Sequence, residues 1–227
     1  MTRITILLDV DNTLLDNDAA KSELDRRIRD HLGDPRADIF WQAYEAVRAE
    51  TSVVSYPCTL ANFWHESDST ASIETRSELA DLVMEFPYAE FLYPGAMDAI
   101  AHLRQFGRVA ILSDGDPAYQ PSKIARAGIV QAVDGYVLVY GHKEEHLDEI
   151  TAAFPADHYL LVEDKPENLT KVRAGLDGAP FTGILVRQGK YAGVAGADAA
   201  ADITLDQVGD LCTLDLSDLL RQDRGHS

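Results

Sequence analysis

The sequence predicts an α/β protein: a doubly wound parallel sheet with an inserted α-helical cap. Three observations lead to this prediction. The apolar run 4–8 near the N-terminus has the composition of a buried parallel strand. Residues 16–91 then show only helical patterns. From Pro94 onward, short apolar runs alternate with helical patterns, which is typical of a parallel sheet covered by helices on both faces.

The inserted segment is predicted to hold about four helices. Apolar residues recur at helical spacing in each of them, as Leu24, Ile28 and Leu32 do in the first. The four predicted helices span 21–32, 37–50, 59–66 and 72–86. We interpret the segment as a cap that packs over the sheet. The predicted domains are therefore a cap of residues 16–91 and a core of residues 1–15 and 92–227.

The remainder of the core is predicted to alternate between helix and strand. Pro121 and Pro166 each begin a helix, where the missing N–H of proline costs no helical hydrogen bond. The predicted helices span 96–106, 121–127, 143–153 and 166–174. The predicted strands span 108–112, 135–140, 158–162 and 182–187, with 203–205 as a last short strand. Residues 189–201 are rich in glycine and alanine and are predicted to form a loop.

Composition excludes several kinds of partner. The net charge of −18 argues against nucleic acid and anionic membranes, which both favour basic surfaces. No apolar stretch reaches membrane-spanning length, and Asp9 and Asp11 interrupt what would be the apolar part of a signal peptide. Cys58 and Cys212 lie far apart without the spacing of a metal site, so we expect reduced thiols in a cytoplasmic protein.

Polar residues follow four of the predicted strands. They are Asp9 and Asp11 after the first strand, Ser113 and Asp114 after the second, Lys143 after the third, and Glu163 and Asp164 after the fourth. Because the carboxyl ends of parallel strands meet at one edge of a sheet, we expect these side chains to converge there. The sequence therefore predicts a site that combines carboxylates, a hydroxyl and an ammonium group.

The aspartate pair alone permits two interpretations. Alternation along an extended chain sends Asp9 and Asp11 to the same side, where a cation or a shared proton must offset their repulsion. Aspartate and asparagine are also common in turns, which makes a plain turn nearly as good an explanation. The residues at the other strand ends favour the charged site.

The whole set suits phosphoryl transfer. Carboxylates are preferred ligands of Mg²⁺, and a carboxylate can attack phosphorus to form an aspartyl-phosphate. A second acid can protonate the leaving alcohol and later activate water. Hydroxyl, backbone N–H and ammonium groups can hold the phosphoryl oxygens during the transfer.

The ordered motifs resemble those of the haloacid dehalogenase-like hydrolase superfamily. The motifs are Asp9-x-Asp11-x-Thr13-Leu14, Ser113-Asp114-Gly115, Lys143 and Glu163-Asp164. The resemblance implies a Rossmann-like core, a C1-type helical cap and a hydrolase that uses Mg²⁺. About thirty residues separate Ser113 from Lys143, which is too few for the large alternative cap of the superfamily.

The resemblance also implies a role for each residue. Asp9 is the nucleophile, and Asp11 is the general acid and base whose backbone carbonyl binds Mg²⁺. Ser113, Asp114 and Lys143 form the substrate-binding group, and Asp9, Asp11 and Asp164 form the metal-binding group. Either Glu163 or Asn168 is the additional metal ligand, and that choice stays open. Asn12 departs from the family pattern, because glycine is frequent at its position.

Other polar and aromatic residues have simpler interpretations. Lys143 stands at a predicted helix start, where a cation is unfavourable against the helix dipole, and this favours a functional role. The polar residues interpreted as surface groups are Lys123, Lys165, Lys171, His142 and His146. Asp114 and Asp116 are expected to shape the loop after the second strand. The cap aromatics are interpreted mainly as core, with Trp41 and Trp64 as candidates to face the cleft.

We therefore expect a Mg²⁺-dependent phosphatase that hydrolyses a small phosphate monoester through an aspartyl-phosphate. Three alternatives stay open. They are a phosphomutase with the same residues, a dehalogenase in which Asp9 attacks carbon without Mg²⁺, and a phosphate-binding protein without turnover. The expected partner is a small phosphorylated metabolite. Monomer and homodimer are both open.

Overall fold

The fold is organised around one parallel sheet. The computed structural model describes residues 3–67, 70–176, 178–193 and 196–216. Its strands are β1 (Ile4–Leu8), β2 (Arg108–Asp114), β3 (Val137–Tyr140), β4 (His158–Glu163), β5 (Phe181–Val186) and β6 (Ile203–Leu205). They pair in the order β3-β2-β1-β4-β5-β6, and every pairing is parallel. The predicted α/β fold with a doubly wound parallel sheet is confirmed.

The two faces of the sheet are covered by different helices. In the central strand β1, Leu7 pairs with Ala110 of β2 and with Leu161 of β4, and all three are fully buried. Ile6 and Leu8 belong to the hydrophobic core on one face of the sheet, with α5 (Ala96–Leu103), α6 (Gln120–Arg126) and α7 (Ile129–Ala132). Leu7 belongs to the core on the other face, with α8 (Leu147–Ala153) and α9 (Pro166–Gly175). Burial on both faces explains why these strands are continuous apolar runs.

The predicted helix 143–153 divides into two parts. Residues Lys143–Glu145 form a 3₁₀ turn, and α8 starts only at Leu147. The backbone N–H of Lys143 is bound by a carboxylate oxygen of Asp114 at 2.9 Å, and His146 has φ −118, outside the helical region. Lys143 therefore lies in a turn that β2 fixes and not in a continuous helix.

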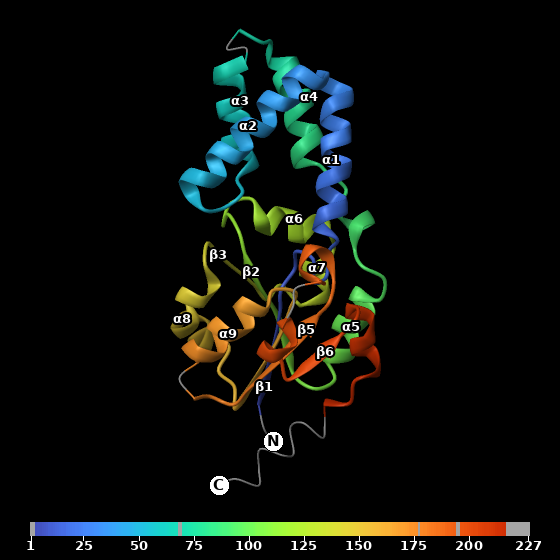
Figure 1. The fold of residues 1–227 in the computed structure, drawn as a ribbon, viewed down its shortest axis with the longest axis vertical. Coiled ribbons are helices and arrows are strands. Elements are labelled where there is room, and N and C mark those ends of the chain that lie inside the picture. Colours follow the sequence, from blue (N-terminus) through green and yellow to red (C-terminus); the bar gives the residue numbers. More distant parts are fainter. Residues whose placement is uncertain (1–2, 68–69, 177, 194–195, 217–227) are drawn as a thin grey trace.

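The segment inserted after β1 is helical and lies beyond the carboxyl ends of the strands (Figure 1). It holds α1 (Asn17–Leu32), α2 (Asp34–Thr51), α3 (Tyr56–Ser67) and α4 (Ile73–Met84). Helix α1 begins four residues before the predicted start because polar side chains cap it. Asp16 accepts a hydrogen bond from Ala19 N at 2.8 Å, and Asn12 Oδ1 accepts one from Asn17 N at 3.0 Å.

The chain leaves and re-enters the sheet region along two adjacent segments. Leu15 forms an isolated antiparallel bridge with Leu92, and Asp16 N donates to Phe91 O at 2.8 Å. These contacts join the start and end of the helical segment. The division of the chain into two domains stays a prediction. In it, residues 16–91 form the cap, and residues 1–15 and 92–227 form the core.

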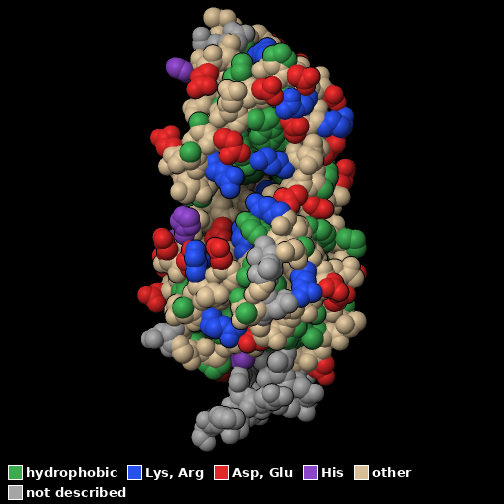
Figure 2. All heavy atoms as spheres, viewed as in Figure 1, with side chains coloured by type: hydrophobic (Ala, Val, Ile, Leu, Met, Phe, Trp, Pro, Cys, Tyr) green, Lys and Arg blue, Asp and Glu red, His purple; other side chains and the backbone are tan. Residues whose placement is uncertain are grey.

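The surface carries mixed charge. Figure 2 shows Lys and Arg side chains interspersed with Asp and Glu over the visible face of the molecule. Among the described residues, no helix has both the length and the apolar composition that a membrane crossing requires. Cys58 is exposed and Cys212 half-buried, and both are free thiols.

Candidate active site

The polar residues at the strand ends lie together at the edge of the sheet that faces the helical segment. Asp9 follows β1, Ser113 and Asp114 end β2, Lys143 lies in the turn after β3, and Glu163 and Asp164 stand at the end of β4. Lys143 Nζ lies 2.8 Å from Asp9 Oδ1, although the two residues are 134 positions apart in the chain. The topology therefore brings the predicted residues into contact.

The loop after β1 holds Asp9 and starts the helical segment. Asp9 is 3% exposed, its N–H donates to Val162 O at 3.0 Å, and Thr13 Oγ1 donates to Asp9 Oδ2 at 3.2 Å. Asn12 has φ 62, a left-handed conformation that asparagine tolerates better than most residues. Asparagine can therefore stand where the family often has glycine, and here its side chain also caps α1.

Lys143 is a fully buried cation between two carboxylates. Its Nζ lies 2.5 Å from Glu163 Oε2, in addition to its contact with Asp9. Burial lowers the pKa of Lys143, but the charges of Asp9 and Glu163 outweigh burial and raise the pKa well above its usual value. The ammonium therefore stays charged and holds Asp9 in place.

Three carboxylates form an acidic cluster. Each of the three residues Asp9, Glu163 and Asp164 contributes one carboxylate oxygen, and these three oxygens lie within 4.8 Å of one another. Both oxygens of Asp164 are buried and have no hydrogen-bond partner among the described residues. Burial and the charge of Glu163 raise the pKa of Asp9 to about 7, and burial with the charges of Glu163 and Asp9 raises that of Asp164 to about 10. The cluster needs positive charge, and its oxygen donors fit a divalent cation such as Mg²⁺.

Glu163 and Asn168, the two candidates for an additional metal ligand, already have protein partners. Asn168 Nδ2 donates to Glu163 Oε2 at 3.1 Å and lies 3.2 Å from Asp114 Oδ2. Glu163 Oε1 accepts from the backbone N–H of Lys165 at 3.1 Å. Although burial opposes it, the charge of Lys143 lowers the pKa of Glu163. Both residues thus help to anchor Lys143 and Asp114, and the identity of an additional ligand stays a prediction.

The interpretation of Lys165 as a solvated residue is wrong. Its side chain is half-buried. Burial lowers the pKa of Lys165, but the charges of Asp9, Glu163 and Asp164 outweigh burial. The pKa of Lys165 is therefore raised above its ordinary value. Lys165 stands directly before α9 and follows Asp164 of the acidic cluster in the chain, and its side chain is partly withdrawn from solvent.

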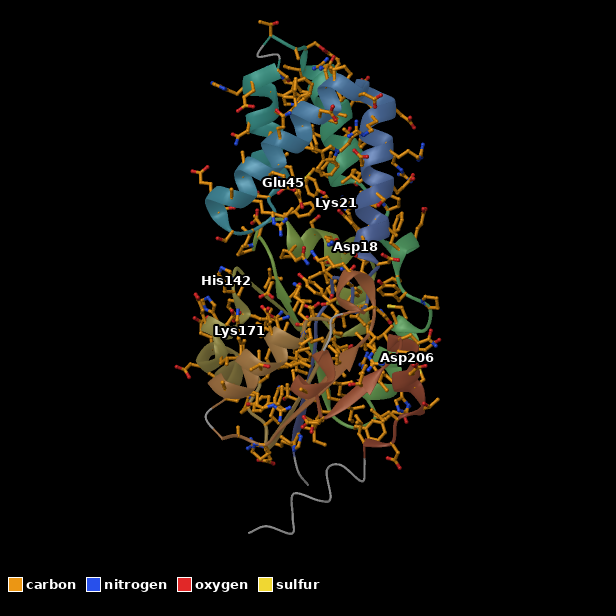
Figure 3. The ribbon with its side chains drawn as sticks, in the orientation of Figure 1. Asp18, Lys21, Glu45, His142, Lys171 and Asp206 are labelled. Carbon is orange, nitrogen blue, oxygen red and sulfur yellow. The ribbon has the colours of Figure 1, made fainter. Side chains whose placement is uncertain are left out.

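The interpretation of Lys123 as a surface residue is also wrong. Lys123 is 5% exposed, and its Nζ lies 2.5 Å from Asp11 Oδ1. The helical pattern located α6 but did not show that this polar residue faces inward, toward Asp11. By contrast, Lys171 is exposed and pairs with Glu144 at 2.7 Å, as expected of a surface lysine (Figure 3). His142 is exposed, and His146 stacks on Tyr140.

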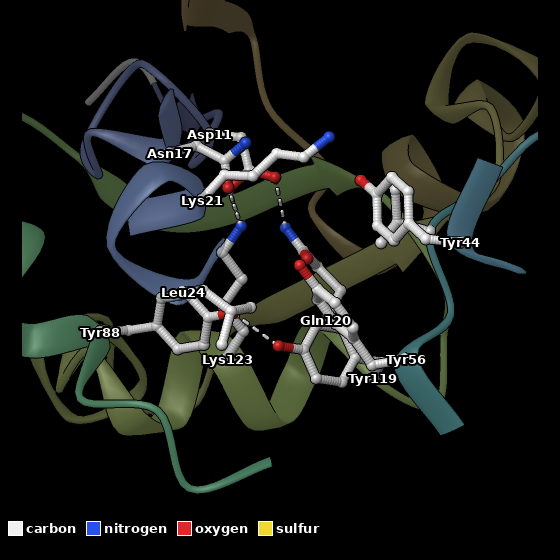
Figure 4. A pocket seen from close by; sticks show the side chains of 11 residues that line it. Asp11, Asn17, Lys21, Leu24, Tyr44, Tyr56, Tyr88, Tyr119, Gln120 and Lys123 are labelled. Atoms are coloured by element: carbon white, nitrogen blue, oxygen red, sulfur yellow. Dashed lines mark hydrogen bonds and ion pairs between the residues drawn. The ribbon is translucent and has the colours of Figure 1, made fainter. Parts of the chain in front are cut away.

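A small cavity of about 50 Å³ lies between the sheet edge and the helical segment (Figure 4). Its lining includes Asp11, Gln120 and Lys123 from the sheet side and Asn17, Lys21, Tyr44 and Tyr56 from the helical side. Tyr44 and Tyr56 are buried, and both line the cavity. The cavity therefore offers hydrogen-bonding groups directly beside Asp11.

Of the two candidates to face the cleft, Trp41 and Trp64, the structure buries Trp64 within the helical segment. Trp41 donates to Asp25 at 2.5 Å and lines an open groove with Lys21, a residue that also lines the cavity. Trp64 is 5% exposed and packs against Phe63 within the helical segment. Tyrosines line the cavity instead. The helical spacing located the aromatic residues but not the face of each helix that turns toward the sheet.

The chain belongs to the haloacid dehalogenase-like hydrolases, because the family model of that description matches residues 5–185. The expected superfamily and the expected enzyme class, a hydrolase, are confirmed. A search of curated proteins finds no match.

Solved structures show the same fold. One from Burkholderia xenovorans LB400, described as a haloacid dehalogenase-like hydrolase, is 35% identical with a TM-score of 0.82, covering 95% of this chain and 100% of that chain. The L-2-haloacid dehalogenase of Xanthobacter autotrophicus, with chloropropionic acid covalently bound, is 17% identical with a TM-score of 0.53, and both chains are fully covered. The HAD-hydrolase YfnB of Bacillus subtilis, bound to magnesium, is 16% identical with a TM-score of 0.58, covering 94% of this chain and 100% of that chain. The last two are too distant to indicate more than the fold.

Proposed function

We propose that this chain is a Mg²⁺-dependent phosphatase that hydrolyses a small phosphate monoester through an aspartyl-phosphate. The observation that carries the proposal is the arrangement around Asp9. Its carboxylate is fixed by Lys143 at 2.8 Å and lies beside Asp164, whose buried oxygens lack hydrogen-bond partners among the described residues. A nucleophile beside an unsatisfied acidic group suits metal-assisted phosphoryl transfer.

In the first step, an oxygen of Asp9 bonds to phosphorus while the bond from phosphorus to the alcohol oxygen breaks. The alcohol oxygen takes the electron pair and receives a proton from Asp11. In the second step, water gives a proton to Asp11, its oxygen bonds to phosphorus, and the bond to Asp9 breaks. The ammonium of Lys143 and the hydroxyl of Ser113 are suited to hold the phosphoryl oxygens.

Mg²⁺ would be held by the carboxylates of Asp9 and Asp164 and by the backbone carbonyl of Asp11. When bound, it keeps these carboxylates ionised and offsets the charge of the phosphoryl group. The acidic cluster of this chain and its membership of the haloacid dehalogenase-like hydrolases support that assignment.

The alcohol part of the ester would enter the cavity beside Asp11. Its small volume of about 50 Å³ favours a compact leaving group, and a lining that includes Lys21, Tyr44 and Tyr56 favours a polar one. We therefore propose a small phosphorylated metabolite as the partner. The net charge of −18 supports neither nucleic acid nor an anionic membrane in that role. The free thiols of Cys58 and Cys212 are consistent with action in the cytoplasm.

The proposal is tested by incubating the purified protein with phosphorylated metabolites and with 2-chloropropionate, with and without Mg²⁺. We expect phosphate release that requires Mg²⁺ and is lost in Asp9→Asn. Halide release without Mg²⁺ would identify a dehalogenase, and formation of an isomer without phosphate would identify a phosphomutase. Binding of Mg²⁺ without turnover of any compound would identify a non-catalytic protein.

A further inference from the structure

Two buried polar residues of α6 face the candidate site without having been assigned a role in it. Gln120 is 4% exposed and Lys123 is 5% exposed. They stand three positions apart, so they lie on the same face of the helix. Each directs its polar end toward Asp11 (Figure 4).

Lys123 holds one oxygen of the Asp11 carboxylate. Its Nζ lies 2.5 Å from Asp11 Oδ1 and 2.7 Å from Asn17 Oδ1 at the start of α1. The same nitrogen lies 5.3 Å above the ring of Tyr88. A buried ammonium requires such partners, because burial without them is costly. The side chain of Lys123 is therefore fixed, and it fixes Asp11 in turn.

Gln120 holds the other oxygen. Its Nε2 lies 3.3 Å from Asp11 Oδ2 and 3.1 Å from Ser113 Oγ. The side chain has little freedom, because it packs so closely against Gly115 that a Cβ on that glycine would lie 3.0 Å from it. One amide group thus connects the proposed general acid with the hydroxyl proposed to bind phosphate.

We propose that Gln120 and Lys123 are positioning residues that clamp the Asp11 carboxylate, one oxygen each, so that it faces the leaving oxygen of the phosphate ester. The inference rests on the proposed phosphatase function and deepens it. Both residues line the cavity proposed for the leaving group, but the role proposed for them is to orient Asp11. Each acts through Asp11, whose exchange of protons with the alcohol and with water depends on its direction.

Substrates with different leaving groups can distinguish this role from a merely structural one. A nitrophenolate leaves without receiving a proton, whereas an alkoxide needs one. Loss of the clamp should therefore slow hydrolysis of an alkyl phosphate much more than that of 4-nitrophenyl phosphate. Damage to the fold or to metal binding would slow both reactions equally.

The experiment compares Lys123→Met, Lys123→Arg and Gln120→Met with the wild type, at saturating Mg²⁺. The two substrates are 4-nitrophenyl phosphate and the alkyl phosphate that the wild type hydrolyses fastest. Lys171→Met is the matched control, because Lys171 is exposed and pairs only with Glu144 among the described residues. Thermal melting with and without Mg²⁺ checks that each variant folds and binds the metal.

For Lys123→Met we expect kcat on the alkyl phosphate to fall about tenfold more than kcat on 4-nitrophenyl phosphate, a modest part of what acid–base catalysis contributes. KM should stay within about twofold, because the residue acts on the chemical step. Lys123→Arg should recover part of the loss, and Lys171→Met should behave like the wild type. Gln120→Met should also slow the alkyl phosphate more, in addition to a loss common to both substrates, because Gln120 holds Ser113 as well.

A double variant tests whether Lys123 acts through Asp11. In an Asp11→Asn background, Lys123→Met should cause no further loss on the alkyl phosphate, because residues that act as a unit are not additive. Equal losses on both substrates, a change confined to KM, or additive effects of the two substitutions would overturn the clamp while leaving the phosphatase function intact. A wild type that hydrolyses neither substrate would overturn both proposals.

Discussion

At the scale of single residues, Lys143 balances the charge of the candidate site and orients its nucleophile. Its ammonium is the cation shared by the two buried carboxylates of Asp9 and Glu163, at 2.8 and 2.5 Å. The same residue is tied to β2, because its backbone N–H donates to Asp114. One side chain therefore supplies charge balance and orientation to the nucleophile. Without it, two carboxylates would remain buried and uncompensated.

Replacement of Lys143 by methionine is expected to destabilise the fold by about 3–5 kcal/mol, the usual cost of removing one partner of a buried ion pair. Urea unfolding measures the loss. The double variant Lys143→Met with Glu163→Gln removes one of the two stranded charges, so it should be more stable than the single variant. A single variant as stable as the wild type would show that Lys143 does not balance this charge.

The sequence was sufficient to predict residues whose place follows from topology. Asp9, Ser113, Lys143 and Asp164 stand at strand ends, and parallel strands end at one edge of the sheet. Lys123 was not predicted, because a polar residue within a helical pattern is ordinarily a solvated one. A glutamine and a lysine three residues apart, early in the helix after β2, are the signal that could have revealed it.

At the scale of elements, the junction between β1 and α1 combines a special backbone conformation with a helix cap. Asn12 adopts φ 62, and its Oδ1 accepts hydrogen bonds from Asn17 N at 3.0 Å and Asp18 N at 3.3 Å. The turn that carries Asp9 thus also starts the helical segment. The predicted start of this helix, residue 21, was late because apolar spacing reports the buried face and not the polar cap.

Two substitutions of Asn12 separate the cap from the backbone conformation. Asn12→Gly keeps access to positive φ but loses the cap, so we expect it to cost about 1 kcal/mol of stability. Asn12→Ala also suffers the left-handed strain and should cost about 1–2 kcal/mol more. Urea unfolding provides the comparison. Equal stability of the two variants would mean that the backbone conformation is not a constraint.

At the scale of the whole molecule, the sheet and the helical segment together form the site. The sheet supplies the acidic cluster, and α1, α2 and α3 supply part of the cavity wall beside Asp11. The acidic cluster could be predicted from sequence, because it follows from strand ends. The cavity wall could not, because the tyrosines that line it carry no motif and depend on how each helix is rotated.

The acidic cluster also makes stability depend on pH when no metal is bound. Burial is the main cause that raises the pKa of Asp164 from its ordinary 3.8 to about 10 in the folded protein. The folded protein therefore holds a proton that the unfolded chain releases. The contribution of this proton to the stability of the folded protein is complete below pH 3.8. It is lost as the pH rises from there toward about 10.

Asp164→Asn should therefore raise the melting temperature of the metal-free protein at pH 8 and flatten its decline with pH. The same variant should lose the stabilisation that Mg²⁺ gives the wild type, which is about 2.7 kcal/mol at a hundredfold excess over Kd. Thermal melting over a pH series, with EDTA or Mg²⁺, measures both effects. A variant that melts lower than the wild type in EDTA, or gains the same stability from Mg²⁺, would contradict the assigned role of Asp164.

The most direct test of the proposed mechanism is detection of a phosphoryl group on Asp9. The wild type is mixed with Mg²⁺ and a phosphate ester, quenched in acid during turnover, digested and analysed by mass spectrometry. We expect one phosphoryl group on the peptide that contains Asp9, and none in Asp9→Asn. Phosphate release by an enzyme that carries no phosphoryl group on Asp9, with full activity retained in Asp9→Asn, would contradict the mechanism.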